Sequence, residues 1–224
     1  MGRTLRIDIG DEIYHVLNRA NARVAIFEEE KDYQDFEIIL EEAKNRYPIK
    51  IFSYQIMPNH WHFCLSPKNN GDMTKFVRWL TLTHTQRWHA RHHSVGSGHL
   101  YQGRYKSFLV QKDNYFLQLC RYIENNALRA KLIQKAEDWR WSSLWRREHG
   151  NDKQKELLSP WPVEIPQDYL RQVNEILAGG ELERIRTSIR KSRPYGNDDW
   201  TNEAIRKFGL EITLRQPGRP RNGS

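Results

Sequence analysis

Cysteine is scarce, long apolar runs are missing and no internal repeat is present in this sequence of 224 residues. The two cysteines, Cys64 and Cys120, both lie in apolar segments, which favours buried thiols in a reducing compartment over a disulfide framework. No stretch approaches the length of about 18 apolar residues that a membrane-spanning helix requires, and the N-terminal residues lack an apolar signal core. We therefore expect a soluble, cytoplasmic protein that does not enter a membrane.

Basic and aromatic residues, in contrast, are abundant. The chain has 36 Lys and Arg against 28 Asp and Glu, a formal net charge of +8, which favours a polyanionic partner. Eight Trp and ten Tyr are many for this length, and some of them can serve as platforms on which unpaired bases stack. A chain of this size can form one good core with a small appendage.

The order of the expected elements is typical of a ferredoxin-like α+β domain. In chain order they are a strand at 12–18, an acidic amphipathic helix at 30–46, strands at 49–57 and 60–66, a helix at 72–91 and a strand at 101–111. A further helix begins at the N-cap Asp113 and is expected to continue to Ala130. This β-α-β-β-α-β pattern predicts an antiparallel sheet with helices on one face, and it allows strand 60–66 to lie under the last helix.

The strand at 60–66 carries a His-x-His pair. Because side chains alternate along a strand, His60 and His62 point to one face while Trp61 and Phe63 point to the other. Two neutral imidazoles on one rigid element are suited to binding a single metal ion. Taken alone the pair is weak evidence, since solvent-facing histidines are common on strands.

The helix that begins at Asp113 carries a second candidate pair. Tyr122 and Asn126 are four residues apart, so they lie one above the other on the flank of the apolar stripe. A tyrosine in this position is often only a half-buried boundary residue. Asn126 is less easily explained, because asparagine is a poor residue for a helix interior. Together the two side chains can present a nucleophile and a third metal ligand.

Several segments of the chain resemble those of the single-tyrosine HUH transposases, in particular the REP-associated tyrosine transposases, which act on repetitive extragenic palindromic DNA. They are spread in order along nearly the whole chain, at 57–62, 98–107, 122–130, 139–143 and 209–220. The resemblance implies that His60 and His62 bind a metal ion, that Tyr122 is the nucleophile and that Asn126 is the third ligand. The chain departs from the family pattern at Ala127, where proline is usual.

This resemblance implies a transposase or endonuclease that depends on Mg²⁺ or Mn²⁺. Tyr122 would attack the scissile phosphate, expel the 3′-hydroxyl and remain joined to the 5′-phosphate as a phosphotyrosine. A phenol on a helix does not easily reach a phosphate within a regular duplex, so the expected partner is single-stranded or hairpin DNA. We expect the nuclease domain at 1–150, a linker at 151–180 and a basic helical extension at 181–224.

The extension carries most of the net charge. From Arg184 onward there are ten Lys or Arg against four Asp or Glu, net +6 of the total +8. Its two short helices predict either a DNA-binding appendage or a brace on the nuclease domain, and the segment 217–221 resembles an Arg-Pro clamp for A·T-rich minor grooves. The candidate DNA-binding residues are Arg104, Lys106, Arg193, Arg215, Arg219 and Arg221.

Two other functions are compatible with parts of the pattern. A DNA-binding regulator could keep this fold without cutting, although the two histidines and the tyrosine argue against it. A hydrolytic metalloenzyme of the amidohydrolase kind would need further His and Asp ligands on a barrel for which this chain is short.

The cluster of His84, His89, His92 and His93 is interpreted as a polar helix end. The sequence leaves open whether the protein is a monomer or a homodimer.

Overall fold

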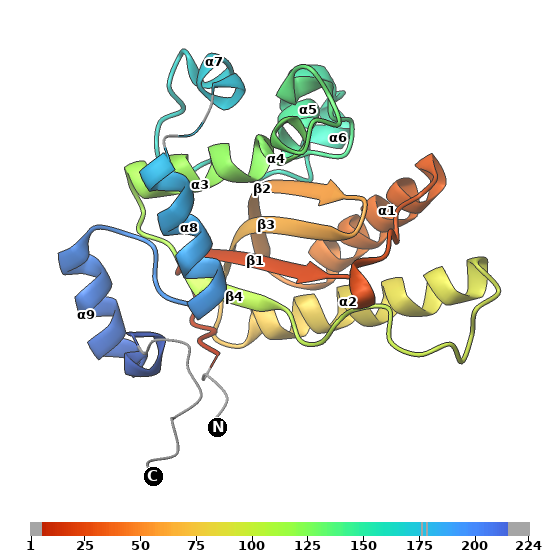
Figure 1. Cartoon of the computed structure of the whole chain (residues 1–224), viewed down its shortest axis with the longest axis horizontal. Coiled ribbons are helices and arrows are strands. Elements are labelled where there is room, and N and C mark those ends of the chain that lie inside the picture. Colours follow the sequence, from red (N-terminus) through yellow and green to blue (C-terminus); the bar gives the residue numbers. More distant parts are fainter. Residues whose placement is uncertain (1–5, 176, 178, 215–224) are drawn as a thin grey trace, which may run out of the picture.

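The fold is built on a four-stranded antiparallel sheet, seen in the computed structural model of the chain, which describes residues 6–175, 177 and 179–214 (Figure 1). The strand order is β2-β3-β1-β4. The strands are β1 (Tyr14–Arg19), β2 (Ile49–Met57), β3 (His60–Pro67) and β4 (Lys106–Leu109). This order is the one that a ferredoxin-like chain produces, so the expected α+β class is confirmed.

Helices α1 (Glu30–Arg46) and α2 (Asp72–Arg91) pack on one face of the sheet, with the boundaries that the sequence pattern predicts. Helix α1 begins where the Asp32 carboxylate accepts hydrogen bonds from the backbone N–H groups of Glu28 and Glu29. Phe36 of α1 and Phe76 of α2 are fully buried there, together with Trp61 and Phe63 of β3. The apolar side of the strand alternation therefore faces these two helices.

Helix α3 (Asn114–Glu124) lies on the opposite face. Its N-cap is Asp113, whose carboxylate accepts a hydrogen bond of 2.9 Å from the backbone N–H of Tyr115. Phe116 and Cys120 are buried against Phe52 and Cys64 of the sheet. The expected helix to Ala130 is interrupted at Asn125, and a separate short helix, α4 (Asn126–Arg129), follows. The sequence predicts one continuous helix here, and this prediction is wrong because the chain forms two helices separated at Asn125.

The chain after α4 folds back onto this framework as a series of short elements. They are η2 (Ala136–Asp138), α5 (Ser143–His149), α6 (Asp152–Lys155), α7 (Tyr169–Asn174), α8 (Gly179–Lys191), α9 (Asp198–Phe208) and η3 (Glu211–Leu214); η1 (Asn21–Arg23) follows β1. The span 151–180, expected as a linker, contains α6 and α7, and Tyr169 and Val173 are buried with α3. None of the helices in the described part of the chain is long and apolar enough to span a membrane.

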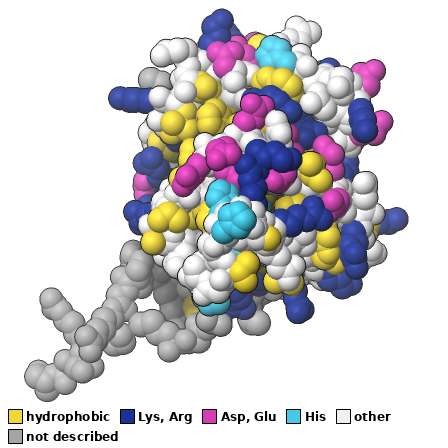
Figure 2. Space-filling view, turned by 90° about the vertical axis from the view of Figure 1, so that its right-hand side faces the viewer, with side chains coloured by type: hydrophobic (Ala, Val, Ile, Leu, Met, Phe, Trp, Pro, Cys, Tyr) yellow, Lys and Arg dark blue, Asp and Glu magenta, His cyan; other side chains and the backbone are white. Residues whose placement is uncertain are grey.

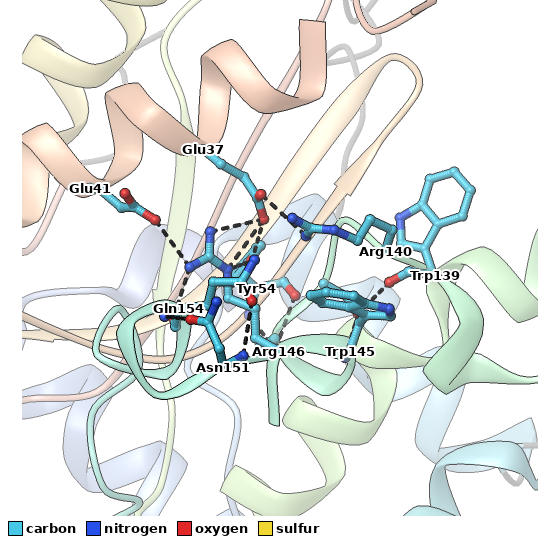
Figure 3. A network of polar contacts seen from close by, with 11 residues as sticks. Glu37, Glu41, Tyr54, Trp139, Arg140, Trp145, Arg146, Asn151 and Gln154 are labelled. Carbon is cyan, nitrogen blue, oxygen red and sulfur yellow. Dashed lines mark hydrogen bonds and ion pairs between the residues drawn. The ribbon is translucent and has the colours of Figure 1, made fainter. Parts of the chain in front are cut away.

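Arg146 of α5 joins α1, β2 and the chain after α5 into one buried network (Figure 3). Its guanidinium donates to the Tyr54 hydroxyl at 2.6 Å and pairs with Glu37 at 3.2 Å, while the Tyr54 hydroxyl donates to Glu37 at 2.6 Å. Arg146 also donates to the carbonyl of Gln154 at 2.8 Å. A buried charge is stable only when it is paired and hydrogen-bonded, so this network fixes the position of α5 on the sheet.

Both edges of the sheet are covered by later parts of the chain. At the β2 edge, Ile56 N–H donates to the carbonyl of Trp141 at 2.9 Å, and Ser159 N–H donates to the carbonyl of Ile51 at 2.7 Å. At the β4 edge, Tyr195 N–H donates to the carbonyl of Leu109 at 2.8 Å. Exposed strand edges invite pairing with other chains, and these contacts remove that opportunity here.

The ends of α1 and α2 are tied together by charged groups. Arg91 pairs with Glu29 at 2.8 Å and with Asp35 at 3.1 Å, and His92 contacts Asp32 at 2.8 Å. Figure 2 shows acidic and basic side chains interspersed around histidines on one face of the molecule. These contacts support the interpretation of the histidine-rich end of α2 as a polar helix end.

Candidate functional site

The face of the sheet under α3 carries His60 and His62, as the strand alternation predicts. His62 is only 3% exposed and His60 is partly buried, and their ring centroids are 5.0 Å apart. Burial lowers the pKa of His60 to about 3, with a contribution from the nearby positive charges of Arg19 and Arg129, and burial also lowers the pKa of His62 far below its ordinary value. Both rings are therefore neutral near pH 7, the form that can bind a metal ion.

Each of these rings uses one nitrogen for a contact within the protein. His60 donates from Nδ1 to the Asn59 side-chain oxygen at 2.6 Å, because an amide oxygen can only accept. His62 Nδ1 lies 2.9 Å from Nε2 of His15, a buried histidine of β1. In both residues Nε2 is the remaining nitrogen, and it is the atom that can face a metal ion.

Tyr122 stands beside this pair on the last turn of α3. Its ring centroid is 6.0 Å from that of His62 and 6.4 Å from that of His15, and the side chain is 7% exposed. Burial raises the pKa of Tyr122, while the positive charges of Arg129, Arg186 and Arg19 lower it. The Arg129 guanidinium lies 4.5 Å from the centre of the Tyr122 ring. Burial is the larger effect, so the pKa of Tyr122 stays above its ordinary value and the phenol is protonated near pH 7, while the neighbouring positive charges offset part of the cost of forming the phenolate.

Asn126 opens α4 immediately after the interruption of the helix. Its side-chain oxygen accepts a hydrogen bond of 2.9 Å from Arg129, and the residue is 8% exposed. No group of three or more His, Cys, Asp or Glu that could hold a metal ion occurs among the described residues. The donors that this site offers to a metal ion are the Nε2 atoms of His60 and His62 and the side-chain oxygen of Asn126. Neutral imidazoles and an amide oxygen fit Mg²⁺ or Mn²⁺ as a mixed set of donors.

Gln55 holds the interruption between Tyr122 and Asn126 in place. It is the cross-strand partner of His62 and is fully buried. In the orientation that satisfies its amide, it accepts from Ala127 N–H at 2.8 Å and donates to the carbonyls of Ile123 and Glu124 at 3.0 Å. The strand that neighbours the histidines therefore fixes the turn that carries the other two candidate residues.

Glu124, at the end of α3, is a second anchor. It is fully buried and accepts hydrogen bonds from Ser53 at 3.0 Å, from Tyr169 at 2.8 Å and from Ser143, and it pairs with Arg147. These partners come from β2, α5 and α7. The last turn of α3, which carries Tyr122, is thus held by contacts from three separate elements.

The candidate DNA-binding residues lie in different places. Arg104 lines an open groove of about 750 Å³ between α2 and the segment 99–105, together with Arg6, Arg78 and Tyr101, and no Asp or Glu lines this groove. Lys106 is exposed on β4 and donates to the carbonyl of Ile189 at 3.4 Å. Arg193 lines a smaller cavity beside α8, whereas Arg215, Arg219 and Arg221 lie outside the described residues. Arg104 and Lys106 also line one further cavity together, beside Ser192, whereas Arg193 does not line that cavity.

Sequence reasoning missed His15, Gln55, Arg129 and Arg19 as neighbours of the site. The alternation of β1 places His15 and Arg19 on the same side as each other, but nothing in the sequence indicates that this side faces Tyr122. Only the pairing of β1 with β3 brings them together.

The His-x-His pair of β3 and the tyrosine of α3 thus lie together on one face of the antiparallel sheet. The sequence model of the family described as "Transposase IS200 like" matches residues 10–126. This span is more than half of the chain, and the protein belongs to that family. The membership supports a transposase role and, in general terms, cleavage of DNA.

Two solved structures are similar to this chain. One is a REP-associated tyrosine transposase bound to a REP hairpin, with 18% identity and a TM-score of 0.56, covering 73% of this chain and 92% of the other. It shows that the fold is shared. The other, a protein from Deinococcus radiodurans assigned as a candidate transposase, has 20% identity and a TM-score of 0.38, covering 56% of this chain and 95% of the other. Among curated protein sequences no relative matches this chain.

Proposed function

We propose that this protein is a divalent-metal-dependent endonuclease and strand transferase that cleaves and rejoins single-stranded or hairpin DNA of the REP type through a 5′-phosphotyrosine on Tyr122. The observation that carries the proposal is the position of Tyr122, whose ring lies 6.0 Å from that of His62 and under the Arg129 guanidinium. A tyrosine that only filled space would not need a partly buried cation and two neutral imidazoles beside it. The family membership supports the same conclusion.

The bound metal ion would supply Lewis-acid chemistry and align the scissile phosphate for in-line attack. His60, His62 and Asn126 are the residues that would hold it. The interactions of Asn59 with His60 and of Arg129 with Asn126 keep two of these donors in fixed orientations.

The protein residues account for the covalent step. The Tyr122 oxygen forms a bond to phosphorus and the bond from phosphorus to the 3′-oxygen breaks. The phenol gives its proton to solvent, and the leaving 3′-oxygen takes one proton from solvent and departs as the 3′-hydroxyl. The positive charges of Arg129 and Arg19 lie near the Tyr122 phenol, where they would stabilise the negative charge that develops during the attack. Attack by a 3′-hydroxyl on the phosphotyrosine reverses the step, which allows a strand to be rejoined or transferred.

The substrate is expected to approach as an unpaired strand. Tyr122 is almost fully buried, so a phosphate reaches it only when its strand can bend into the site. The groove lined by Arg6, Arg78 and Arg104 offers positive charge and an aromatic wall to a neighbouring part of the DNA. Gln102, which lines this groove, donates its N–H to the carbonyl of Arg19 of β1 at 2.9 Å.

The test is covalent capture of a labelled hairpin oligonucleotide. In the presence of Mg²⁺ or Mn²⁺ the protein should give a denaturant-resistant adduct, and Tyr122→Phe should lose the adduct and cleavage while DNA affinity stays nearly unchanged. Tyr115→Phe is the matched control on the same helix, because Tyr115 contacts Tyr195 and Arg184 of the C-terminal region. Loss of the adduct in Tyr115→Phe alone would contradict the assignment. Tight DNA binding by the wild type with no adduct would instead indicate a regulator that binds without cutting.

A further inference from the structure

His15 is a buried histidine for which the proposed reaction gives no role. It has no exposed surface and lies between Phe108, with ring centroids 4.8 Å apart, and His62, with ring centroids 5.1 Å apart and planes inclined by 23°. Its Nε2 is 2.9 Å from Nδ1 of His62, and its Nδ1 is buried without a hydrogen-bond partner in the described part of the chain. A buried polar atom without a partner is unfavourable, so an apolar side chain would fill this space at lower cost.

The hydrogen bond between the two rings has two possible directions. A neutral imidazole carries one proton, so one of the two facing nitrogens donates and the other accepts. If His15 donates, His62 accepts at Nδ1 and carries its own proton on Nε2, which then has no lone pair for a metal ion. If His62 donates from Nδ1, its Nε2 is free to bind the metal ion. The direction of this one hydrogen bond therefore decides whether His62 can be a ligand.

We propose that His15 is a positioning residue for His62, accepting its Nδ1–H so that the His62 ring is oriented with Nε2 free for a metal ion. The inference rests on the proposed function, because it requires His62 to be a ligand. Asn59 makes the corresponding contact for His60 through the bond of 2.6 Å from Nδ1 to the amide oxygen. The two candidate ligands of β3 thus each have an acceptor of their own, one from the turn before the strand and one from the neighbouring strand β1. Such partners fix the orientation of a ligating ring and raise its basicity.

The affinity for Mn²⁺, measured from the electron paramagnetic resonance signal of the free ion, tests the proposal without any reaction. In His15→Phe the ring stacking is kept but the acceptor is removed, and Mn²⁺ binding should weaken by about 10-fold to 100-fold. In His15→Gln the side-chain oxygen can take the place of Nε2, and most of the affinity should be retained. The matched control is His84→Phe, since His84 is equally buried but bonds to the Tyr101 hydroxyl at 2.7 Å on the other side of the sheet. Its Mn²⁺ affinity should equal that of the wild type.

A second measurement uses the unmodified protein. Long-range ¹H–¹⁵N correlation spectra of the histidine rings at saturating Mg²⁺ should show the His62 proton on Nδ1 and the His15 proton on Nδ1. A His62 proton on Nε2 in the Mg²⁺-bound protein would overturn the proposal.

The outcomes separate this inference from the proposed function. Unchanged Mn²⁺ affinity in His15→Phe, together with loss of binding in His62→Ala, would exclude the positioning role and leave the metal site in place. Failure of the wild type to bind Mn²⁺ would overturn the metal site and the role of His15 together. Weakened binding in His15→Phe with recovery in His15→Gln supports the role, because a merely space-filling residue would not discriminate between these two replacements.

Discussion

Arg129 is the residue on which the separate parts of the site converge. It lies 4.5 Å from the centre of the Tyr122 ring, donates to the Asn126 side-chain oxygen at 2.9 Å and approaches the carbonyl of Tyr122 at 3.4 Å. It is partly buried, so its charge acts in a medium that screens it less than water does. A single side chain thus holds a candidate ligand and places a cation beside the candidate nucleophile.

Replacing this cation should slow cleavage more than it weakens DNA binding. We expect Arg129→Gln to lower the single-turnover rate of hairpin cleavage by about 10² to 10³, the effect typical of removing one preorganised group that stabilises developing charge. Arg129→Lys should recover part of the rate, because the positive charge is restored. The control is Arg171→Gln, which removes an exposed arginine paired with Asp168 and Glu175. Cleavage by Arg129→Gln at the wild-type rate would show that Arg129 has only a structural role.

The histidine pair of β3 can be distinguished from the histidines of α2 by metal titration. The double variant His60→Ala/His62→Ala should lose the tight Mn²⁺ site, because both imidazole ligands are gone. The double variant His89→Ala/His92→Ala should retain it, since His92 contacts Asp32 and His89 contacts Ser94 at 2.8 Å. Isothermal titration calorimetry of the two proteins gives the comparison. A tight site that survives in the β3 variant would contradict the proposed ligands.

The alternation of side chains along a strand was enough to predict that His60 and His62 share a face. It was not enough to predict their environment, which depends on residues far away in the sequence. His15 is 47 residues from His62, and the two meet only through the antiparallel register of β1 and β3. A register cannot be deduced from one strand alone, so the hydrogen bond between these rings was not predictable.

At the scale of the elements, the end of α3 depends on buried polar groups rather than on its apolar stripe. The Gln55 amide makes the hydrogen bonds that the backbone around Asn125 loses where the helix is interrupted. The Glu124 carboxylate connects the last turn of α3 to β2, α5 and α7. The resemblance to a motif with proline at position 127 left the end of this helix uncertain. Ala127, unlike proline, has a backbone N–H, and in this structure that N–H donates a hydrogen bond to the Gln55 side-chain oxygen. The interruption is therefore stabilised by the sheet and not by a proline.

Loss of the Glu124 carboxylate should destabilise the whole domain. We expect Glu124→Ala to lower the free energy of unfolding by about 3–5 kcal/mol, because it leaves the mostly buried guanidinium of Arg147 and the buried hydroxyl groups that donate to Glu124 without their partner. Glu183→Ala is the matched control, since Glu183 pairs with Arg190 on the surface, where water screens the pair and its loss should leave the stability nearly unchanged. Urea denaturation followed by circular dichroism measures both. Equal stability of the two variants would show that Glu124 is dispensable for the fold.

At the scale of the whole molecule, the basic C-terminal region is packed on the domain as far as it is described. Tyr195 extends the β4 edge and its hydroxyl donates to Gln118 at 2.7 Å, while Ile185 is buried with α3. Ile205 and Leu210 join the core on the side of α1 and α2. Figure 1 shows α8 crossing beside α3 and β4. For residues 181–214 these contacts support the role of a brace.

Two truncations separate the brace from a role of the tail in binding DNA. Removal of residues 191–224 deletes Ile205 and Leu210 and exposes the apolar surface that these two side chains cover. It should lower the free energy of unfolding by about 3 kcal/mol or more. Removal of residues 215–224 leaves every described interaction intact and should preserve the melting temperature. If Arg215, Arg219 and Arg221 bind phosphates, this shorter truncation lowers the slope of log K against log salt by about 0.9 for each phosphate of duplex DNA that is no longer neutralised. An unchanged slope would show that these three residues do not bind DNA.

The order of strands and helices was predictable because each element has its own periodicity and the ferredoxin-like pattern leaves few ways to arrange them. The choice between a brace and an appendage was not predictable, because an amphipathic stripe such as that of Trp200, Ile205 and Phe208 fits either. What decides it is the surface on which the stripe packs, and that surface is formed by residues of the nuclease domain.

During synthesis the edge strands of the sheet are protected from pairing with other chains only after the segments that cover them have been made. The strands are complete once β4 has left the ribosome, but the residues that close the β2 edge follow α4, and Tyr195, which closes the β4 edge, emerges later still. Until then the nascent chain presents two free strand edges to its neighbours on a polysome. Translation that stops soon after residue 126 therefore yields a sheet with all of its strands and neither of its covers, the form most prone to pair with another copy of itself.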